Sequence, residues 1–262
     1  MSTAPAPAPR PVALVTGAAQ RVGRAIALEL AARGWDLAVH YRGSQTEAVE
    51  TVERAASLGA RALAFQADLA DEPECRALLP AVRSVFGPVR AVVNNASLFE
   101  YDDVAHFNYE RMDRHWRANT APAIVLAQAL HAQLDGEARG CVVNLLDQKL
   151  WNPNPDYFSY TLSKAALEAA TTLLAQALAP KVRVCGVAPG VTLVSGTMDA
   201  AGFESARRMT PLGYSSSPED IARSVAFLLD SPAITGTTLL VDGGQHLLAQ
   251  ARDVLFLTPQ KA

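Results

Sequence analysis

The sequence predicts a single-domain α/β fold, a doubly wound, seven-stranded parallel sheet with helices on both faces. Three observations lead to this prediction. Apolar, β-branched runs alternate with longer helical patterns, seven such runs occur, and a glycine-containing turn, "TGAAQRVG", follows the first of them. Strands that alternate with helices pair in parallel through right-handed crossovers, and a glycine turn after the first strand is typical of a nucleotide-binding sheet.

Strands are expected where apolar residues run together between turn residues. They are Val12–Thr16, Leu37–Tyr41, Ala62–Gln66, Ala91–Asn94, Cys141–Leu146, Val182–Val187 and Thr238–Val241. Helices are expected between them, at Arg21–Arg33, Glu47–Leu58, Glu74–Phe86, Arg114–Leu134, Phe158–Leu178 and Pro218–Leu229.

No linker or repeat interrupts this pattern, so residues 11–248 are predicted to form one domain. Residues 1–10 are rich in Ala and Pro, and we expect a disordered arm there. Residues 249–262 are apolar for a chain end, which predicts a tail that packs on a neighbouring subunit.

Composition excludes several classes of protein. The net charge of -3 and the lack of a basic run argue against a nucleic-acid partner. No apolar run approaches the ~20 residues of a membrane helix, so no membrane partner is expected. The three cysteines, Cys75, Cys141 and Cys185, are far apart and lie in apolar runs, which indicates neither a metal site nor disulfides. A cytoplasmic location follows as the expectation.

The glycine turn predicts a site for a nucleotide pyrophosphate. Gly17 ends the first strand and Gly23 lies one turn into the next helix, where backbone N–H groups and the helix N-terminus would face the phosphates. A plain strand-to-helix connection is the alternative. Arg21 occupies the middle position, where such turns often carry glycine.

The end of the second strand indicates which dinucleotide binds. A carboxylate there usually contacts the ribose 2′-hydroxyl of NAD, whereas a cation accommodates the 2′-phosphate of NADP. This chain reads "AVHYRGS", with His40, Arg42 and Ser44 and no acid. The pattern favours NADP(H), the alternative being a solvated arginine at a strand end.

Polar residues after the third and fourth strands extend this site. Asp68 can accept a hydrogen bond from an adenine amino group, with Leu69 against the ring, and Asn95 in "NNAS" would lie beside the ribose and nicotinamide. Each residue is also acceptable as turn chemistry.

The stretch "YTLSK" places Tyr160 and Lys164 four residues apart on one face of a helix. An ammonium group near a phenol stabilises the phenolate, so Lys164 is expected to lower the pKa of Tyr160 and make it a useful proton donor. The same ammonium could hold the nicotinamide ribose.

Together, "TGAAQRVG", "NNAS", Asn119, Tyr160 with Lys164, "PG" at 189–190 and "TG…VDGG" at 235–244 resemble the short-chain dehydrogenase/reductase family over residues 11 to 247. The resemblance implies a Rossmann-fold NAD(P)-dependent oxidoreductase, commonly a homotetramer. It implies catalytic roles for Asn119, Tyr160 and Lys164, with Asn119 anchoring a water beside Lys164. The cofactor-binding residues expected from these motifs are Gly17, Arg21, Val22, Gly23, His40, Tyr41, Arg42, Ser44, Asp68, Leu69, Asn95, Ala96, Ser97, Lys164, Pro189 and Gly190.

Two departures from the usual family pattern narrow the resemblance. Asp147 stands where most members have a serine, and Arg21 replaces the middle glycine. With "HYR.S" and Phe99, these residues are similar to the pteridine reductases. That subfamily implies that Arg21 faces cofactor phosphate and pterin, that Phe99 stacks on the pterin, and that Ser97 joins the substrate site. Asp147 and Tyr160 would deliver protons while NADPH delivers hydride.

The aspartate substitution has a chemical reason. A carboxyl group can protonate a ring nitrogen, and Phe99 offers a flat heteroaromatic ring a stacking partner. Asp147 must then hold a proton near neutral pH, which requires a pKa raised by burial, and Lys164 would oppose that shift.

The expected function is therefore an NADPH-dependent reductase of pterins, acting on dihydropterin and also on dihydrofolate, with a small-molecule partner. Two alternatives stay open. One is a reductase of carbonyl substrates such as 3-oxoacyl thioesters, and the other is a non-catalytic NADP(H)-binding protein on the same fold.

Overall fold

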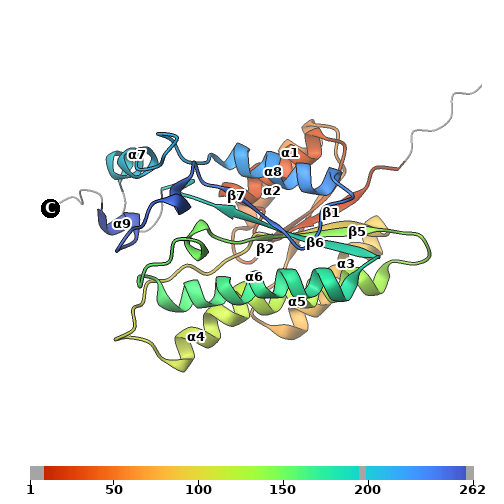
Figure 1. Ribbon diagram of the computed structural model, residues 1–262. Coiled ribbons are helices and arrows are strands. Elements are labelled where there is room, and N and C mark those ends of the chain that lie inside the picture. The colour runs from red at the N-terminus through yellow and green to blue at the C-terminus, as the bar shows by residue number, and fades with distance from the viewer. Residues whose placement is uncertain (1–8, 195–198, 258–262) are drawn as a thin grey trace, which may run out of the picture.

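The computed structural model describes residues 9–194 and 199–257. Seven parallel strands form one sheet in the order β3-β2-β1-β4-β5-β6-β7 (Figure 1). They are β1 Val12–Val15, β2 Asp36–Tyr41, β3 Ala62–Gln66, β4 Val89–Asn94, β5 Gly140–Leu145, β6 Val182–Pro189 and β7 Thr238–Val241. The strand order reverses between β1 and β4, and open sheets of this kind bind ligands beyond the carboxyl ends of the strands at such a point.

Helices cover both faces of the sheet (Figure 1). One layer holds α1 (Arg21–Ala32), α2 (Gln45–Ser57) and α8 (Pro218–Asp230), and the other holds α3 (Glu72–Phe86), α5 (Ala121–Gln133) and α6 (Phe158–Leu178). Alternate strand residues face the two layers, because side chains alternate across a strand: Ala13 and Val15 of β1 pack with the first layer and Leu14 with the second. The single-domain Rossmann fold expected from the sequence is confirmed.

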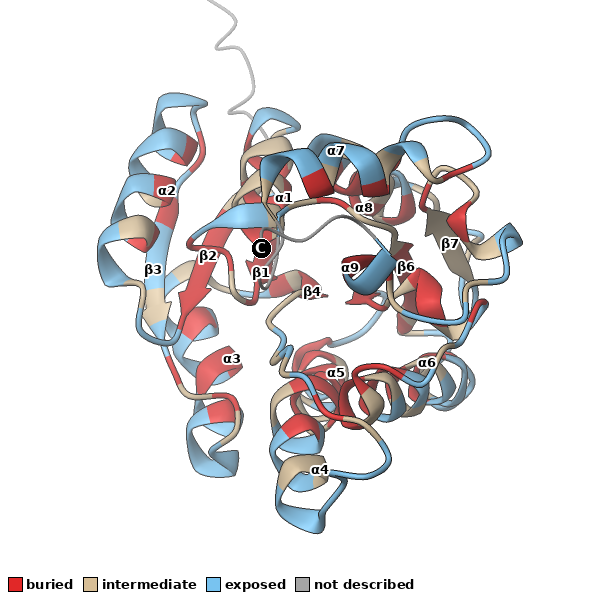
Figure 2. Cartoon of the chain, turned by 90° about the vertical axis from the view of Figure 1, so that its left-hand side faces the viewer, coloured by how far each residue is buried: buried red, intermediate tan, exposed pale blue. Residues whose placement is uncertain are grey.

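Shorter elements complete the described part of the chain. They are α4 (Tyr109–His115), a π-helical turn (Trp116–Thr120), α7 (Ala200–Arg208), α9 (Val254–Leu257) and two 3₁₀ turns, Gln148–Leu150 and Gln245–Leu247. Figure 2 faces the carboxyl edge of the sheet, where α7 and α9 lie over the ends of the buried strands. No helix among residues 9–194 and 199–257 is long and apolar enough to cross a membrane.

All seven expected strands exist, with ends that agree within two residues. The expected helix Arg114–Leu134 is wrong as one regular helix, since it begins earlier as α4 and widens into the π-helical turn before α5. Pro122 supplies the physical reason, because a proline has no N–H to continue the helical hydrogen bonds and fits at the start of a new helix. Asn119, an expected catalytic residue, lies in that widened turn.

Two expected segments fall partly outside the described residues. The arm at residues 1–10 is described only from residue 9, and Arg10 donates hydrogen bonds to the carbonyl oxygens of Ala31 and Gly59. The tail at residues 249–262 is described to residue 257, and Val254 and Leu255 are buried within their own chain. Its contact with a neighbouring subunit stays a prediction.

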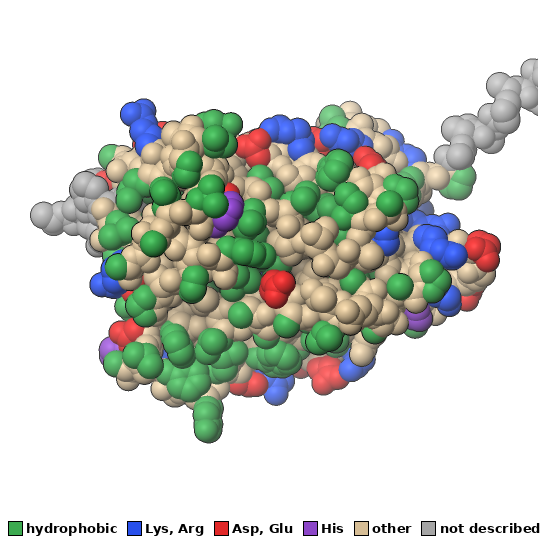
Figure 3. All heavy atoms as spheres, viewed as in Figure 1, with side chains coloured by type: hydrophobic (Ala, Val, Ile, Leu, Met, Phe, Trp, Pro, Cys, Tyr) green, Lys and Arg blue, Asp and Glu red, His purple; other side chains and the backbone are tan. Residues whose placement is uncertain are grey.

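The edge strand β7 lies on the face shown in Figure 3, where hydrophobic side chains are scattered over α6 and α8. Leu173 of α6 and Phe227 of α8 are more than half exposed. Sheet edges and apolar faces of this kind are common sites of subunit association. The expected homotetramer is consistent with this face and stays a prediction.

A buried carboxylate caps the helix that carries Tyr160 and Lys164. Asp102, from the loop after β4, accepts hydrogen bonds from the backbone N–H (2.9 Å) and the hydroxyl of Ser159, in the first turn of α6. The residue before α6, Tyr157, has left-handed backbone angles and makes no side-chain cap. Asp102 therefore replaces the missing local cap and joins the loop after β4 to the N-terminus of α6.

We expect Asp102→Ala to lower the free energy of unfolding by about 2 kcal/mol, because two buried donors of Ser159 lose their acceptor. Chemical denaturation followed by circular dichroism measures this change. Asp113→Ala is the matched control, since its carboxylate forms an exposed pair with Arg117 and contributes about 0.5 kcal/mol. Equal stability of the two variants would contradict the capping role.

Candidate active site

The glycine turn between β1 and α1 packs directly on the end of β4. The Asn95 side chain donates to the carbonyl oxygens of Thr16 (2.9 Å) and Gly17 (3.2 Å), and the Thr16 hydroxyl accepts from the N–H groups of Asn95 and Ala96. A Cβ on Gly23 would lie 2.2 Å from the Gly17 carbonyl oxygen, so no side chain fits there. Sequence reasoning missed Thr16, although a polar residue at the end of an apolar strand was a usable signal.

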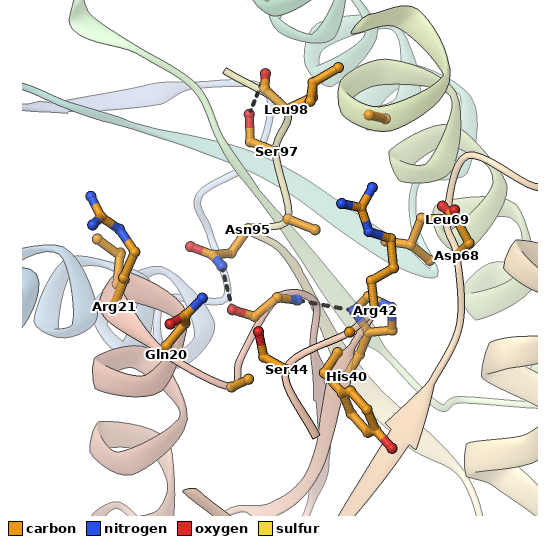
Figure 4. Close-up of a pocket in the computed structure, with 18 of the residues that line it drawn as sticks. Gln20, Arg21, His40, Arg42, Ser44, Asp68, Leu69, Asn95, Ser97 and Leu98 are labelled. Atoms are coloured by element: carbon orange, nitrogen blue, oxygen red, sulfur yellow. Dashed lines mark hydrogen bonds between the residues drawn. The ribbon is translucent and has the colours of Figure 1, made fainter. Parts of the chain in front are cut away.

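A cleft of about 500 Å³ opens beside this turn, at the point where the strand order reverses. It brings together thirteen of the expected cofactor-binding residues: Gly17, Arg21, Val22, Gly23, His40, Tyr41, Arg42, Ser44, Asp68, Leu69, Asn95, Ala96 and Ser97. In Figure 4, Arg42 extends toward Asp68 and Leu69 at one end, while Arg21 lies at the other. Pro189 and Gly190 line a neighbouring cavity, and Lys164 lines neither.

The N-terminus of α1 at this cleft suits an anion. Its N-cap residue, Gln20, makes no side-chain hydrogen bond, and no acidic residue lies in the first turn. Helix N–H groups and the positive end of the helix dipole therefore face the cleft without a capping side chain. This arrangement fits the diphosphate of a dinucleotide.

His40 lines the cleft but does not act as a cation there. Its ring is buried, with Nδ1 accepting the Gly17 N–H at 3.0 Å and Nε2 3.1 Å from the Ala67 carbonyl oxygen. Burial lowers the pKa of His40 to about 4, so the ring is neutral near pH 7. His40 therefore positions the glycine turn, and Arg42 is left as the positive group after β2.

Arg21 has a backbone conformation that favours glycine. Its φ is 56°, a left-handed value that costs a non-glycine residue about 1 kcal/mol. The guanidinium donates to the Val194 carbonyl oxygen at 3.0 Å, and the residue lines both the cleft and the neighbouring cavity. Arg21 is thus positioned between the cleft and the neighbouring cavity.

The neighbouring cavity has a volume of about 240 Å³. Four of the five expected substrate-binding residues line it, namely Arg21, Phe99, Asp147 and Tyr160. The fifth, Ser97, lies instead in the cleft and donates a hydrogen bond to Asn119.

Asp147 and Tyr160 form a hydrogen-bonded pair in the cavity wall, with the phenol donating to the carboxylate at 2.9 Å. Burial raises the pKa of Asp147, which is the direction that a proton donor needs, although hydrogen bonds from Lys149 and Tyr160 act against that shift. The pKa of Tyr160 is raised well above its usual value by burial and by the charge of Asp147. The expectation that Lys164 lowers the Tyr160 pKa is therefore wrong for this arrangement.

Lys164 is buried beside the Tyr160 ring. Its ammonium donates to the Leu145 carbonyl oxygen at 2.7 Å and is 5.8 Å from the centre of the Tyr160 ring. Burial lowers the pKa of Lys164 to about 8, with the charge of Asp147 acting against that shift. The ammonium therefore predominates at pH 7, where it can hold a hydroxyl group.

Asn119 joins the loop after β4 to α6. Its amide oxygen accepts from the Leu98 N–H at 2.6 Å, and its NH₂ group donates to the Leu98 carbonyl oxygen and to the Ser163 hydroxyl. These contacts hold the loop that presents Ser97 and Phe99. The expected water beside Lys164 stays a prediction.

Aromatic rings line one wall of the cavity. Phe99 stacks on Tyr157, with ring centres 4.1 Å apart and planes 14° apart. Phe99 and Tyr160 form a T-shaped pair, with ring centres 4.7 Å apart. Phe99 is 40% exposed, so part of its ring remains available to a ligand. Within the described part of the chain, no three His, Cys, Asp or Glu residues are grouped so that they could hold a metal ion.

Comparison with known proteins supports a relationship over nearly the whole chain. A family model described as enoyl-(acyl carrier protein) reductase matches residues 17–246. The crystal structure of FolM alternative dihydrofolate reductase 1 from Brucella suis in complex with NADP is 40% identical, with a TM-score of 0.88, and the match covers 93% of this chain and 98% of that chain.

Two curated proteins are similar over comparable lengths. The 3-oxoacyl-(acyl-carrier-protein) reductase FabG of Staphylococcus aureus is 34% identical over 241 residues, which cover 90% of this chain and 98% of that protein. An uncharacterized oxidoreductase of Methylorubrum extorquens is 35% identical over 241 residues, covering 89% and 96%. With these matches and the Tyr160 and Lys164 arrangement, the chain belongs to the short-chain dehydrogenase/reductase family of oxidoreductases.

Proposed function

We propose that the protein is an NADPH-dependent pterin reductase, which reduces dihydropterins to the tetrahydro level and also accepts dihydrofolate. The observation that carries this proposal is the Asp147–Tyr160 hydrogen bond, 2.9 Å long, in a small cavity lined by Phe99. A carboxyl group beside a phenol can supply a proton to a ring nitrogen, and an aromatic side chain can stack on a flat ring. The similarity to the FolM dihydrofolate reductase of Brucella suis supports the same substrate class.

The cleft suits NADPH. The uncapped N-terminus of α1 would bind the diphosphate, Arg42 the 2′-phosphate, and Asp68 with Leu69 the adenine. Lys164 would hold the nicotinamide ribose through its ammonium group. The FolM structure of Brucella suis was determined in complex with NADP, which supports this cofactor.

Reduction of a carbon–nitrogen double bond takes one hydride and one proton. NADPH supplies the hydride when it is bound. The proton goes to the ring nitrogen from the Asp147–Tyr160 pair, in which both groups have raised pKa values and stay protonated to higher pH than exposed ones. Phe99 and Arg21 would orient the ring, one by stacking and one by charge.

A second candidate is the reduction of 3-oxoacyl thioesters. It is favoured by the 34% identity to FabG of Staphylococcus aureus. The same Tyr160 and Lys164 could protonate a carbonyl oxygen, with Asp147 in place of the usual serine. The two candidates differ in their need for Asp147, because a carbonyl oxygen requires an orienting hydrogen bond and a ring nitrogen requires a proton.

Asp147→Ser tests the proposal directly. We expect kcat for dihydropterin to fall by about 100-fold, the usual contribution of a general acid, while the dissociation constant of NADPH stays the same. Steady-state kinetics and NADPH fluorescence titration measure the two quantities.

Asp230→Ser is the control for this variant, because it removes an exposed carboxylate at the end of α8. Its kinetics should match those of the unmodified protein. Undiminished dihydropterin turnover in Asp147→Ser would contradict the proposed role of the carboxyl group.

Arg42→Ala tests the choice of cofactor. Loss of the positive group after β2 should raise the KM for NADPH by about 10-fold or more and leave the KM for NADH unchanged, since only NADPH carries the 2′-phosphate. Arg54→Ala removes an exposed arginine from the other end of α2 and should change neither value. An equal rise in the KM values for NADPH and NADH would contradict the assignment of Arg42 to the 2′-phosphate.

A further inference from the structure

We infer that Asp253 is a second substrate-binding carboxylate, which accepts hydrogen bonds from the aminopyrimidine edge of a pterin. This inference rests on the proposed function and extends it, because it gives a residue of the C-terminal segment a part in substrate selection.

The segment before α9 returns to the cavity. Asp253, Val254 and Leu255 line the same 240 Å³ cavity as Asp147 and Tyr160. These two groups of residues lie far apart in the sequence. In Figures 1 and 2, α9 lies at the carboxyl edge of the sheet, beside the end of β6. The cavity is therefore closed on one side by the C-terminal segment.

Ionic contacts with the loop after β5 fix this segment. Arg252 donates through Nε to both carboxylate oxygens of Asp156, at 3.0 and 2.8 Å, and the Asp253 N–H donates to Asp156 at 2.7 Å. Lys149, which is buried, donates to the Asp156 carbonyl oxygen at 2.6 Å and pairs with Asp253 at 3.3 Å. Asp253 is thus held in place from both its backbone and its side chain.

The Asp253 carboxylate keeps acceptor capacity. Oδ1 accepts the Leu255 N–H at 3.1 Å and Oδ2 pairs with Lys149, so each oxygen has a further lone pair. The side chain is 18% exposed, at the cavity wall. Its negative charge also contributes, after burial and nearer groups, to the raised pKa values of Asp147 and Tyr160, which indicates its proximity to them.

Substrate chemistry explains why a second carboxylate is useful. A pterin carries an amino group and a ring N–H side by side, a planar pair of donors that matches the two oxygens of a carboxylate, as a guanidinium does. Asp147 is hydrogen-bonded to Tyr160, and the proposed function assigns this pair to the reacting ring nitrogen. Asp253 would bind the donor edge while Asp147 serves the reacting nitrogen, and a 3-oxoacyl thioester offers no such edge.

Steady-state kinetics of Asp253→Asn test this inference with two substrates, 7,8-dihydropterin and dihydrolumazine, in which oxygen replaces the 2-amino group. We expect the KM for dihydropterin to rise by about 10-fold or more, because the Asn NH₂ group faces another donor, with kcat changed by less than about 3-fold. The KM for dihydrolumazine should stay unchanged or fall. A KM that rises equally for both substrates, or for neither, would overturn the inference.

Asp230→Asn is the control, since it removes an exposed carboxylate at the end of α8 that does not line the cavity. It should leave both KM values within about 2-fold, and a rise equal to that of Asp253→Asn would overturn the inference. If Asp253→Asn does not fold, equilibrium binding to the unmodified protein with NADP⁺ gives the answer. Dihydropterin should bind at least about 10-fold more tightly than dihydrolumazine, and equal affinity would overturn the inference.

The two proposals fail in different ways. Absence of turnover of dihydropterin by the unmodified protein would reject the proposed function, and the inference with it. Normal turnover that is insensitive to Asp253→Asn would reject the inference and leave the proposed function standing.

Discussion

Gly23 lies so close to the turn after β1 that a Cβ would come within 2.2 Å of the Gly17 carbonyl oxygen. This close packing brings the N-terminus of α1 to the carboxyl edge of the sheet, where Asn95 from the end of β4 joins it. His40, held neutral by burial, fixes the same turn from β2. Three strands thus meet at one uncapped helix end, and both the cleft and the neighbouring cavity are built around it.

Burial governs the chemistry of the cavity. Taking charge out of water raises the pKa values of Asp147 and Tyr160, so both groups stay protonated to higher pH than exposed ones. Burial also lowers the pKa of Lys164 to about 8, and its ammonium still predominates at pH 7. The helix that carries Tyr160 and Lys164 begins at a cap supplied by Asp102, from the loop that also presents Phe99. Tyr160 and Phe99 are consequently positioned by two connections between this loop and α6, one through Asp102 and one through Asn119.

The fold and most of the site could be predicted because strand and helix patterns are local, and parallel strands bring their carboxyl ends to one edge. The spacing of four residues between Tyr160 and Lys164 likewise predicted that both lie on one face of a helix. The neutral state of His40 depends on burial, which no local pattern reports. Pro122 indicated an interruption of the helix near Asn119. The long apolar pattern on both sides of Pro122 nevertheless favoured one continuous helix. Asp253 gave no signal, since its place in the cavity depends on long-range ion pairs.

The choice of a pterin as substrate can be decided by comparing kcat/KM for NADPH oxidation with 7,8-dihydropterin and with a 3-oxoacyl thioester. Both reactions are followed by the near-ultraviolet absorbance of NADPH. We expect a preference for the dihydropterin of at least about 100-fold, because the cavity pairs the Asp147 carboxyl group with an aromatic side chain. Turnover of the thioester alone would contradict it and would leave only the family assignment.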